Sequence, residues 1–518
     1  MDSPKLAPPE NRLRPIARAV AVVVSAPPPV RAPSWAALLV VLVALGGGLR
    51  AVALASDRCL WIDEAMLALN LVDRTPRQLF DKLDYNQGAP VGFLLAVKAS
   101  VSAFGPRAWA LRLVPFVASL AGLVAFAVVA RRLLPGPGAV LAVGLFAVSP
   151  HLISYAGECK QYASDAAIAV GLLALALGQL EGAGGFWRRA VLAVAGAAAV
   201  WCSHPAAFVL GGIGTALLAR GAVARNWGAV RATGATIAVW LVSFAGCYFL
   251  CLKQLDNNAY LTGYWSGHFL ALPPKGLGDA AWLVDHLVAF FTAPGGFGGP
   301  RVPLGGFAAA LALIGLRVFA RERWPVALAL TVPVALVLLA SGLQKYPIGG
   351  RLMLFMAPFA VLLVARAGWA VCEALAEKNG FAARVLLVLL VAAPLWESVE
   401  VLRKPPRAEQ LAPVLDQVRA SFRPGDRVFV YYGAVPAFRF YTRPHPFPAD
   451  SVTLGAEHRA DPTAYRSELA GLRGRVWLVV SHRHGDEEAR LLAVLDGRGA
   501  RRAEVRHPGA AAYLYELE

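Results

Sequence analysis

Charged residues are scarce in this chain: Asp, Glu, Lys and Arg make up 16% of its 518 residues, against about 25% in ordinary soluble domains. Methionine is also rare, with four residues. Hydrophobic residues reach 57%, and the mean hydropathy is +0.55. So apolar a chain of this length excludes a soluble globular protein and predicts a polytopic α-helical membrane protein.

The apolar runs lack the alternation of polar and apolar residues that a transmembrane β-barrel requires, so a barrel is excluded as well. Each run is about 16–22 residues long, which is the length of a bilayer-spanning helix. We predict eleven spans, at residues 35–55, 109–130, 137–152, 163–180, 189–203, 206–220, 232–252, 303–320, 325–343, 352–371 and 384–400.

Cysteine is limited to six residues, none at the spacing of a metal site. Cys59 and Cys159 both fall near the candidate site described below. The sequence leaves a disulfide between them open.

Basic residues outnumber acidic ones by 50 to 33, and the formal net charge is +17. Most arginines lie between apolar runs, where they set membrane orientation, so we expect membrane lipids rather than nucleic acid as partners. The basic clusters fall on one side of the membrane if residues 1–34 are a disordered cytoplasmic tail. We interpret residues 89–104, which are apolar but short, as an interfacial or re-entrant helix. The external loops are then 56–108 and 253–302.

Composition changes after Pro405-Pro406, at the end of a transmembrane domain that we place at residues 35–400. Apolar residues recur with a period of two in RVFVYYG (427–433) and RVWLVVSH (475–482), and a helical stretch, DEEARLLAVLDG, follows. We predict that residues 401–518 form a small soluble α/β domain on the extracytoplasmic side.

Two adjacent carboxylates, Asp63 and Glu64, follow the first long apolar run. Their flanks are apolar, and carboxylates beside a bilayer are costly to desolvate, which favours a functional site. A helix N-terminus stabilised by two acids is the alternative. We predict that Asp63 and Glu64 act in catalysis.

A second polar segment, SYAGECKQYASD at 154–165, separates two apolar spans. Glu158, Tyr162 and Asp165 recur at intervals of four and three, so in a continuous helix they share one face, and Lys160 points elsewhere. We predict that Glu158 is catalytic and that Lys160, Tyr162 and Asp165 bind substrate. A solvated helix start is the alternative.

Basic residues on the outer face run against the usual charge asymmetry of membrane proteins. Arg112 lies inside a span and Arg351 opens one, so each needs an anionic partner. That partner is either a lipid phosphate, which guanidinium matches with paired donors, or an intramembrane glutamate. Arg58 and Lys345 are assigned to substrate binding with them, and His204 is either a helix cap or a substrate ligand.

These segments together resemble the GT-C superfamily of integral-membrane glycosyltransferases, in particular the bacterial family-39-like branch that includes aminoarabinose transferases and protein O-mannosyltransferases. The resemblance covers residues up to about 250, then Arg351 and the tail more loosely. It rests on R-x-L-W-x-D-E-A at 58–65, D-Y-N-Q-G-A-P at 84–90, F-G-x-R-x-W-A-L-R at 104–112 and E-x-K-Q-Y-x-S-D at 158–165.

The resemblance implies a multi-pass protein of the bacterial inner membrane that takes a sugar from a polyprenyl-phosphate donor and transfers it on the outer face. The acceptor is an unidentified glycan, lipid or protein. Asp63 matches the acid that positions or deprotonates the acceptor, and Glu64 is its partner. Arg351 matches the basic residue near the donor phosphate, and Lys160 stands where many relatives have arginine. From the residues alone, we expect partial desolvation to raise the pKa of Asp63 and make it a base.

No set of metal ligands is evident, although a divalent metal bridged by the acids stays open. A transporter or flippase of lipid-linked sugars is the alternative function. It predicts functional charges within the spans, whereas here the candidate groups gather in external loops. A non-catalytic scaffold is a third hypothesis.

Overall fold

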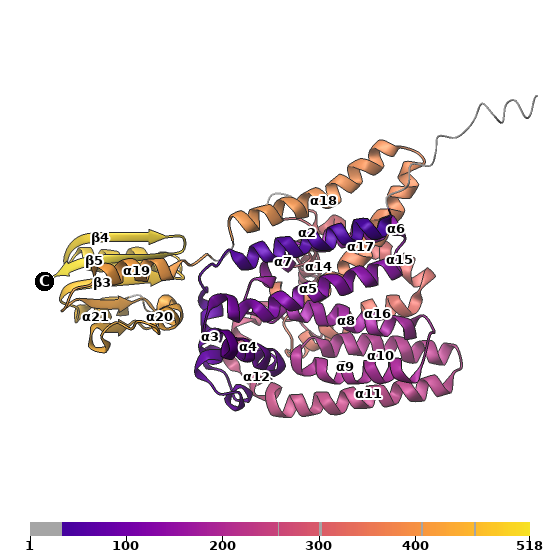
Figure 1. The fold of residues 1–518 in the computed structure, drawn as a ribbon, viewed down its shortest axis with the longest axis horizontal. Helices are drawn as coiled ribbons and strands as arrows, with labels where there is room; N and C mark the ends of the chain where they lie inside the picture. The colour runs from indigo at the N-terminus through magenta and orange to yellow at the C-terminus, as the bar shows by residue number, and fades with distance from the viewer. Residues whose placement is uncertain (1–33, 257, 300–302, 406–407, 460, 462) are drawn as a thin grey trace, which may run out of the picture.

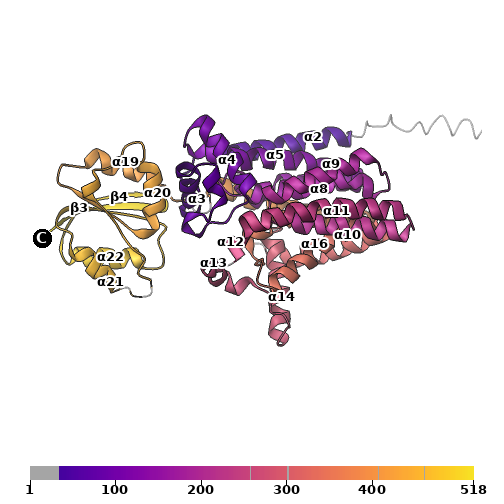
Figure 2. The ribbon, with the colours of Figure 1, turned by 90° about the horizontal axis from the view of Figure 1, so that it is seen from below.

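The computed structural model describes residues 34–256, 258–299, 303–405, 408–459, 461 and 463–518. The predicted cytoplasmic tail therefore lies outside the described residues, apart from Ser34. The described chain forms a helical bundle with an α/β domain at one end, and the chain enters the bundle at the opposite end (Figures 1 and 2).

Within the described residues, eight helices are long and apolar enough to cross a membrane, or nine if one bent pair counts as a single span. The chain is therefore a multi-pass membrane protein, as predicted. The eight are α2 (Trp35–Ala55), α5 (Ala108–Leu133), α8 (Tyr162–Leu180), α10 (Ala206–Val223), α11 (Trp227–Cys247) with its continuation through η3 (Tyr248–Leu252) and α12 (Lys253–Asp256), α16 (Trp324–Gly342), α17 (Ala357–Ala376) with the preceding turn η5 (Gly350–Met356), and α18 (Gly380–Arg403).

The other three predicted spans are helical but depart from the simple span in different ways. The span at 137–152 is the bent pair α6 (Gly136–Ala147) and α7 (Pro150–Ala156), which meet at 50°. Helix α9 (Phe186–Cys202) has 17 residues, and α15 (Gly305–Glu322) carries three charged residues in its last two turns. The hydropathy pattern thus located a helix at each of the eleven predicted spans but not α14 (Leu277–Thr292), which lies in the predicted external loop 253–302, and it gave the count of spans less well.

The bend between α6 and α7 leaves backbone carbonyls without helical partners inside the bundle, where each must be satisfied by protein. Arg50 of α2 supplies the donors. Its guanidinium donates to the carbonyl oxygens of Ala147 at 3.1 Å and Phe146 at 3.2 Å, and to Ser119 Oγ at 2.8 Å. This fully buried arginine is therefore a structural element of the broken span.

Short elements crowd the end of the bundle next to the α/β domain (Figure 2). Helix α4, residues 91–104, is a 14-residue apolar helix, as expected for the segment left out of the span count. The short elements are α3 (Ile62–Asp73), η1 (Arg77–Phe80), η2 (Asp84–Asn86), α4 (Val91–Phe104), α13 (Ala259–Tyr264), η4 (Ser266–His268) and α14 (Leu277–Thr292).

The C-terminal domain has a five-stranded sheet in the order β2-β1-β3-β5-β4. Strand β1 pairs in parallel with β2 and β3, and β5 pairs antiparallel with β3 and β4. The predicted strand at 475–482 is confirmed as β3, and the run at 427–433 is a strand only at its start, as β1, because the chain turns into η6 at Tyr432. Its elements are α19 (Leu411–Ser421), β1 (Arg427–Val430), η6 (Tyr432–Ala434), α20 (Val435–Thr442), η7 (Ala449–Ser451), β2 (Val452–Leu454), α21 (Ala464–Ala470), β3 (Gly474–Ser481), α22 (Glu487–Asp496), β4 (Gly499–His507) and β5 (Ala510–Leu517).

The two parts share a hydrophobic core. Leu60, Leu67 and Phe93 of the membrane domain belong to the same buried cluster as Val414 and Phe438 of the C-terminal domain. Helix α20 lies against α3 in both views (Figures 1 and 2). This shared burial holds the C-terminal domain against the segment that carries the two predicted acids.

Candidate active site

The segment that leads into α3 is fixed from the C-terminal domain. Three backbone N–H groups of residues 59–62 donate across the domain boundary: Cys59 to Gln410 Oε1 at 3.4 Å, Leu60 to Tyr441 Oη at 2.7 Å and Ile62 to Glu409 Oε2 at 2.9 Å. Asp63 and Glu64 then occupy the first turn of α3, where the helix dipole favours negative charge. Contacts with the C-terminal domain therefore fix the backbone that precedes both acids.

Glu64 is fully buried and paired with Arg112. Its carboxylate accepts from Arg112 Nη2 at 2.8 Å and Nε at 2.9 Å, and from the Cys159 N–H at 2.7 Å. Burial raises the pKa of Glu64, but Arg112 outweighs this effect and the net pKa is lowered. Of the two partners considered for Arg112, a lipid phosphate and a glutamate, the structure shows a glutamate, which lies in the first turn of α3.

Asp63 lies between two cations. Its Oδ1 is 2.9 Å from Lys160 Nζ and its Oδ2 is 2.6 Å from Arg351 Nη1. Gln87 joins the group: its amide donates to Asp63 Oδ1 at 3.1 Å, and its Oε1 accepts from Lys160 Nζ at 2.7 Å. Four segments that are distant in the sequence thus meet at one carboxylate.

The expectation of a raised pKa for Asp63 is wrong. Burial does raise the pKa of this carboxyl group, but Lys160 and Arg351 outweigh burial and hold it well below its ordinary value. The carboxylate is therefore ionised at neutral pH. It is a weak base for as long as both cations face it.

The expected helix face of Glu158, Tyr162 and Asp165 is also wrong. Helix α7 ends at Ala156 and α8 begins at Tyr162, so Glu158 and Lys160 lie in the turn between them. This turn directs Lys160 to Asp63, although a continuous helix would point it elsewhere. Glu158 is buried, with Oε1 3.5 Å from Arg58 Nη2, and Arg58 also donates to the carbonyl of Gly157 at 3.0 Å.

Arg351 reaches Asp63 because of the two glycines before it. A Cβ atom at Gly349 would collide with the ring of His268, and Gly350 has a φ of +43°, which glycine adopts readily. The guanidinium lies over the rings of Trp61 at 5.6 Å and Tyr162 at 5.5 Å. Its side chain is 17% exposed, so the cation is fixed by rings and carboxylate yet open on one side.

The structure does not bring the other predicted binding residues into this ion-pair network. Among the described residues, Lys345 pairs with Asp256 at 2.5 Å, and Asp165 is buried on the first turn of α8 without an ion pair. His204 lies in the turn between α9 and α10. Cys59 and Cys159 are buried free thiols, so the disulfide that the sequence left open is not formed.

His204 gives a prediction about stability. Burial lowers the pKa of its imidazole from 6.5 to about 4. Between these values the unfolded chain binds a proton that the folded chain does not, so stability falls as the pH is lowered from about 6.5 to about 4. Glutamine cannot titrate. As the pH is lowered over this interval, we therefore expect the melting temperature of His204→Gln to fall less steeply than that of the wild type. Parallel pH profiles of the two proteins would refute the assignment.

The sequence analysis missed Gln87 and Glu409. Gln87 stands within the motif D-Y-N-Q-G-A-P, where its polarity beside an apolar segment was the available signal. Glu409 also accepts from Ile62 and is 2.7 Å from His482 Nδ1. No local pattern marks a residue that acts on a backbone 347 positions away.

The described residues hold no group of three His, Cys, Asp or Glu side chains that could bind a metal ion. The oxygens of Asp63 face Lys160 and Arg351, and those of Glu64 face Arg112. The two carboxylates thus point at different cations and not at a common position. These carboxylates, each already paired with a cation, do not fit a bridged divalent metal.

No protein-family model and no curated protein matches this chain. The aminoarabinose transferase ArnT from Cupriavidus metallidurans is 14% identical, with TM-scores of 0.55 in the apo state and 0.56 bound to undecaprenyl phosphate; the match covers 92% of this chain and 97% of that one. The oligosaccharyltransferase AglB from Archaeoglobus fulgidus, in complex with an inhibitory peptide and a dolichol-phosphate, is 13% identical, with a TM-score of 0.52 over 92% of this chain and 74% of that one.

ArnT and AglB are GT-C glycosyltransferases, and the likeness extends over nearly the whole chain, including the C-terminal domain. At this level of identity it establishes the fold. This chain is a multi-pass membrane protein with the GT-C fold.

Proposed function

We propose that the chain is a membrane glycosyltransferase that moves a sugar from a polyprenyl-phosphate donor to an acceptor on the outer face of the bacterial inner membrane. The observation that carries this proposal is the position of Asp63 between Lys160 and Arg351. Two cations face one carboxylate, which leaves a formal charge of about +1 at the site. The likeness to ArnT bound to undecaprenyl phosphate and AglB bound to a dolichol-phosphate supports the class of donor.

The donor phosphate binds where Asp63 now meets its cations. Arg351 presents paired N–H donors that match phosphate oxygens, and Lys160 adds a point charge. As the phosphate takes over these contacts, Asp63 loses the interactions that depress its pKa. The carboxylate becomes a stronger base only once the donor is in place.

In the sugar transfer, one proton moves, one bond forms and one bond breaks. The acceptor hydroxyl gives its proton to Asp63, and its oxygen forms a bond to the anomeric carbon of the sugar. The bond between that carbon and the phosphate oxygen breaks, and its electron pair stays with the departing polyprenyl phosphate. Lys160 and Arg351 stabilise the negative charge that develops there. Product release returns the proton from Asp63 to solvent.

The remaining polar residues hold this arrangement. Glu64 and Arg112 fix the first turn of α3 to the turn before α8, through the Cys159 N–H. Arg58 and Glu158 fix the same turn from the other side. Tyr162 supports the guanidinium of Arg351. We assign these residues to positioning.

An ion-pair group at the opposite end of the bundle supports the proposed orientation. Glu181 bridges Arg132, in the last turn of α5, and Arg323, between α15 and α16, at 2.5 and 2.7 Å. The basic turns at this end match the arginine excess of cytoplasmic loops. The C-terminal domain and α3, which carries Asp63, lie at the other end of the bundle (Figure 1), and in this orientation they face outward.

Arg351→Ala is expected to raise the KM for a polyprenyl-phosphate sugar at least tenfold and to lower kcat/KM by about 10²–10³, because an electrostatic partner of the leaving phosphate is lost. Arg351→Lys keeps the charge without the paired donors, so its kcat/KM is expected to lie between those of the wild type and of Arg351→Ala. The measurement is release of polyprenyl phosphate by the purified protein. Arg321→Ala, at an exposed position on α15, is the control. Equal kinetics for Arg351→Ala and wild type would overturn the phosphate site.

Glu409→Ala removes the acceptor that holds the Ile62 N–H and the partner of His482. Since small displacements of catalytic groups are costly, we expect kcat to fall about tenfold. Glu409→Gln keeps an acceptor for Ile62, so its loss is expected to be smaller. The control is Glu457→Ala, an exposed acid of the same domain. Unchanged kcat in Glu409→Ala would show that the C-terminal domain does not position Asp63.

A further inference from the structure

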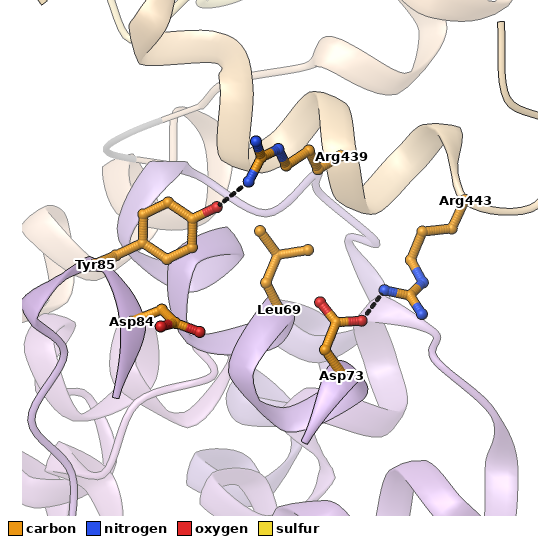
Figure 3. A pocket seen from close by; sticks show the side chains of 6 residues that line it. All are labelled: Leu69, Asp73, Asp84, Tyr85, Arg439 and Arg443. Atoms are coloured by element: carbon orange, nitrogen blue, oxygen red, sulfur yellow. Dashed lines mark hydrogen bonds and ion pairs between the residues drawn. The ribbon is translucent and has the colours of Figure 1, made fainter. Parts of the chain in front are cut away.

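A cavity of about 540 Å³ lies at the seam between the two domains. Its lining residues come from α3, from η2 and from the end of α20 in the C-terminal domain with the residue after it: Leu69, Asp73, Asp84, Tyr85, Arg439 and Arg443. Figure 3 shows Arg439, on α20, and Arg443, directly after this helix, reaching down toward Tyr85 and Asp73, with Leu69 between them. The volume falls in the range of about 300–1,000 Å³ that small-molecule sites occupy.

The lining is polar and balanced in charge. Arg443 pairs with Asp73, and Arg439 Nη1 donates to Tyr85 Oη at 3.0 Å, which leaves its other donors available. Asp84 accepts from Arg74 at 3.0 Å, while its side chain is 68% exposed. Two carboxylates and two guanidinium groups therefore line the cavity with a formal sum of zero.

The floor of the cavity is connected to Asp63. Tyr85 and Asn86 both have positive φ values, of 58° and 51°, a left-handed conformation that is uncommon for residues other than glycine. The next residue, Gln87, donates to Asp63. Along α3, Leu69 and Asp73 follow Asp63 by six and ten residues, or about 9 and 15 Å at 1.5 Å per residue.

We propose that this cavity binds an uncharged, hydroxyl-rich sugar unit of the acceptor, next to the unit that receives the transferred sugar. The proposal rests on the proposed function and names the class of acceptor. The hydroxyl groups of such a unit accept from Arg439 and donate to Asp84, and the apolar face of a sugar ring packs on Tyr85 or Leu69. A phosphate would meet the exposed carboxylate of Asp84, and a cationic group would meet two arginines. The balanced charge favours a neutral glycan over either.

Direct binding separates this proposal from the transfer reaction. The probes are mannotriose, maltotriose and cellotriose, each tested by saturation-transfer NMR on the full chain in nanodiscs, with inorganic phosphate and a neutral tripeptide as competing ligands. We expect at least one trisaccharide to bind, and Arg439→Gln and Asp84→Asn each to weaken it at least fivefold. Arg490→Gln and Asp81→Asn, at exposed positions, are the matched controls. Binding of phosphate or tripeptide but no trisaccharide, or equal binding by all variants, overturns the proposal.

The kinetic test uses the same variants with a polyprenyl-phosphate sugar and a glycan fraction of the cell envelope. Arg439→Gln and Asp84→Asn are expected to raise the KM for the glycan about tenfold and to leave the KM for the donor unchanged. Melting temperatures equal to the wild type show that the variants are folded. Transfer by the wild type with unaltered glycan KM in both variants refutes the sugar site alone. Absence of any transfer by the wild type refutes the proposed function, and the binding experiment still decides the cavity.

Discussion

Asp63→Asn is expected to lower the rate of sugar transfer by about 10³-fold, within the range of about 10²–10⁴ that a general base contributes. Asparagine keeps the size of the side chain and a carbonyl oxygen for Gln87, but it cannot take the acceptor proton. The measurement is kcat for release of polyprenyl phosphate from a polyprenyl-phosphate sugar. The control is Asp81→Asn, at an exposed position in the chain between α3 and α4, and it is expected to match the wild type.

The same substitution has an opposite effect on donor binding. Asp63 competes with the donor phosphate for Lys160 and Arg351, so its neutralisation frees both cations. We expect Asp63→Asn to bind undecaprenyl phosphate at least as tightly as the wild type does, and more tightly at low salt, where charge interactions are less screened. Loss of binding together with loss of turnover would show that Asp63 is a structural support of the site rather than its base.

Glu64→Gln is expected to lower the free energy of unfolding by about 3–5 kcal/mol, the usual cost of removing one partner from a buried ion pair. Glu64 is fully buried, and Arg112, 1% exposed, would keep its charge with one fewer anion to meet it. The measurement is thermal unfolding in one detergent at constant pH. The double variant Glu64→Met, Arg112→Met removes both charges and is expected to recover part of the loss.

This result distinguishes two roles for Glu64. As a positioning residue, it changes stability strongly, and the activity that survives at low temperature keeps the donor KM of the wild type. As a catalytic partner of Asp63, it would leave the melting temperature unchanged while transfer is abolished. A Glu64→Gln protein that melts like the wild type and is inactive would therefore contradict the structural assignment.

Local patterns in the sequence predicted the eleven span helices and the C-terminal α/β domain, and the resemblance of four motifs to a known superfamily predicted the GT-C fold. The apolar runs located the spans because a bilayer-spanning helix requires a continuous apolar segment, which is visible in the local sequence. The same rule identified Asp63, Arg351 and Lys160 as unusual residues, and these do meet in the fold. Their individual contacts were less predictable, since a helical face was assumed through residues 157–161, where the chain turns.

The electrostatics of Asp63 could not be predicted from its neighbours in the sequence. Apolar flanks implied a raised pKa, but the two cations that reverse the shift come from positions 160 and 351. The contacts from Glu409 and Tyr441 were likewise invisible, because they depend on how a separate domain docks. Such long-range contacts decide whether an acidic side chain acts as a general base, as a counter-ion or as a positioning residue.

The most direct measurement follows both ends of the donor in proteoliposomes. A polyprenyl-phosphate sugar labelled in the sugar is supplied with a cell-envelope fraction, and cleavage is recorded beside movement of intact donor between leaflets. Wild-type protein should convert the donor to polyprenyl phosphate and a labelled acceptor, with no faster leaflet exchange than protein-free vesicles. Intact donor that crosses the membrane without cleavage would identify a flippase and contradict the assignment of Asp63, Lys160 and Arg351 to sugar transfer.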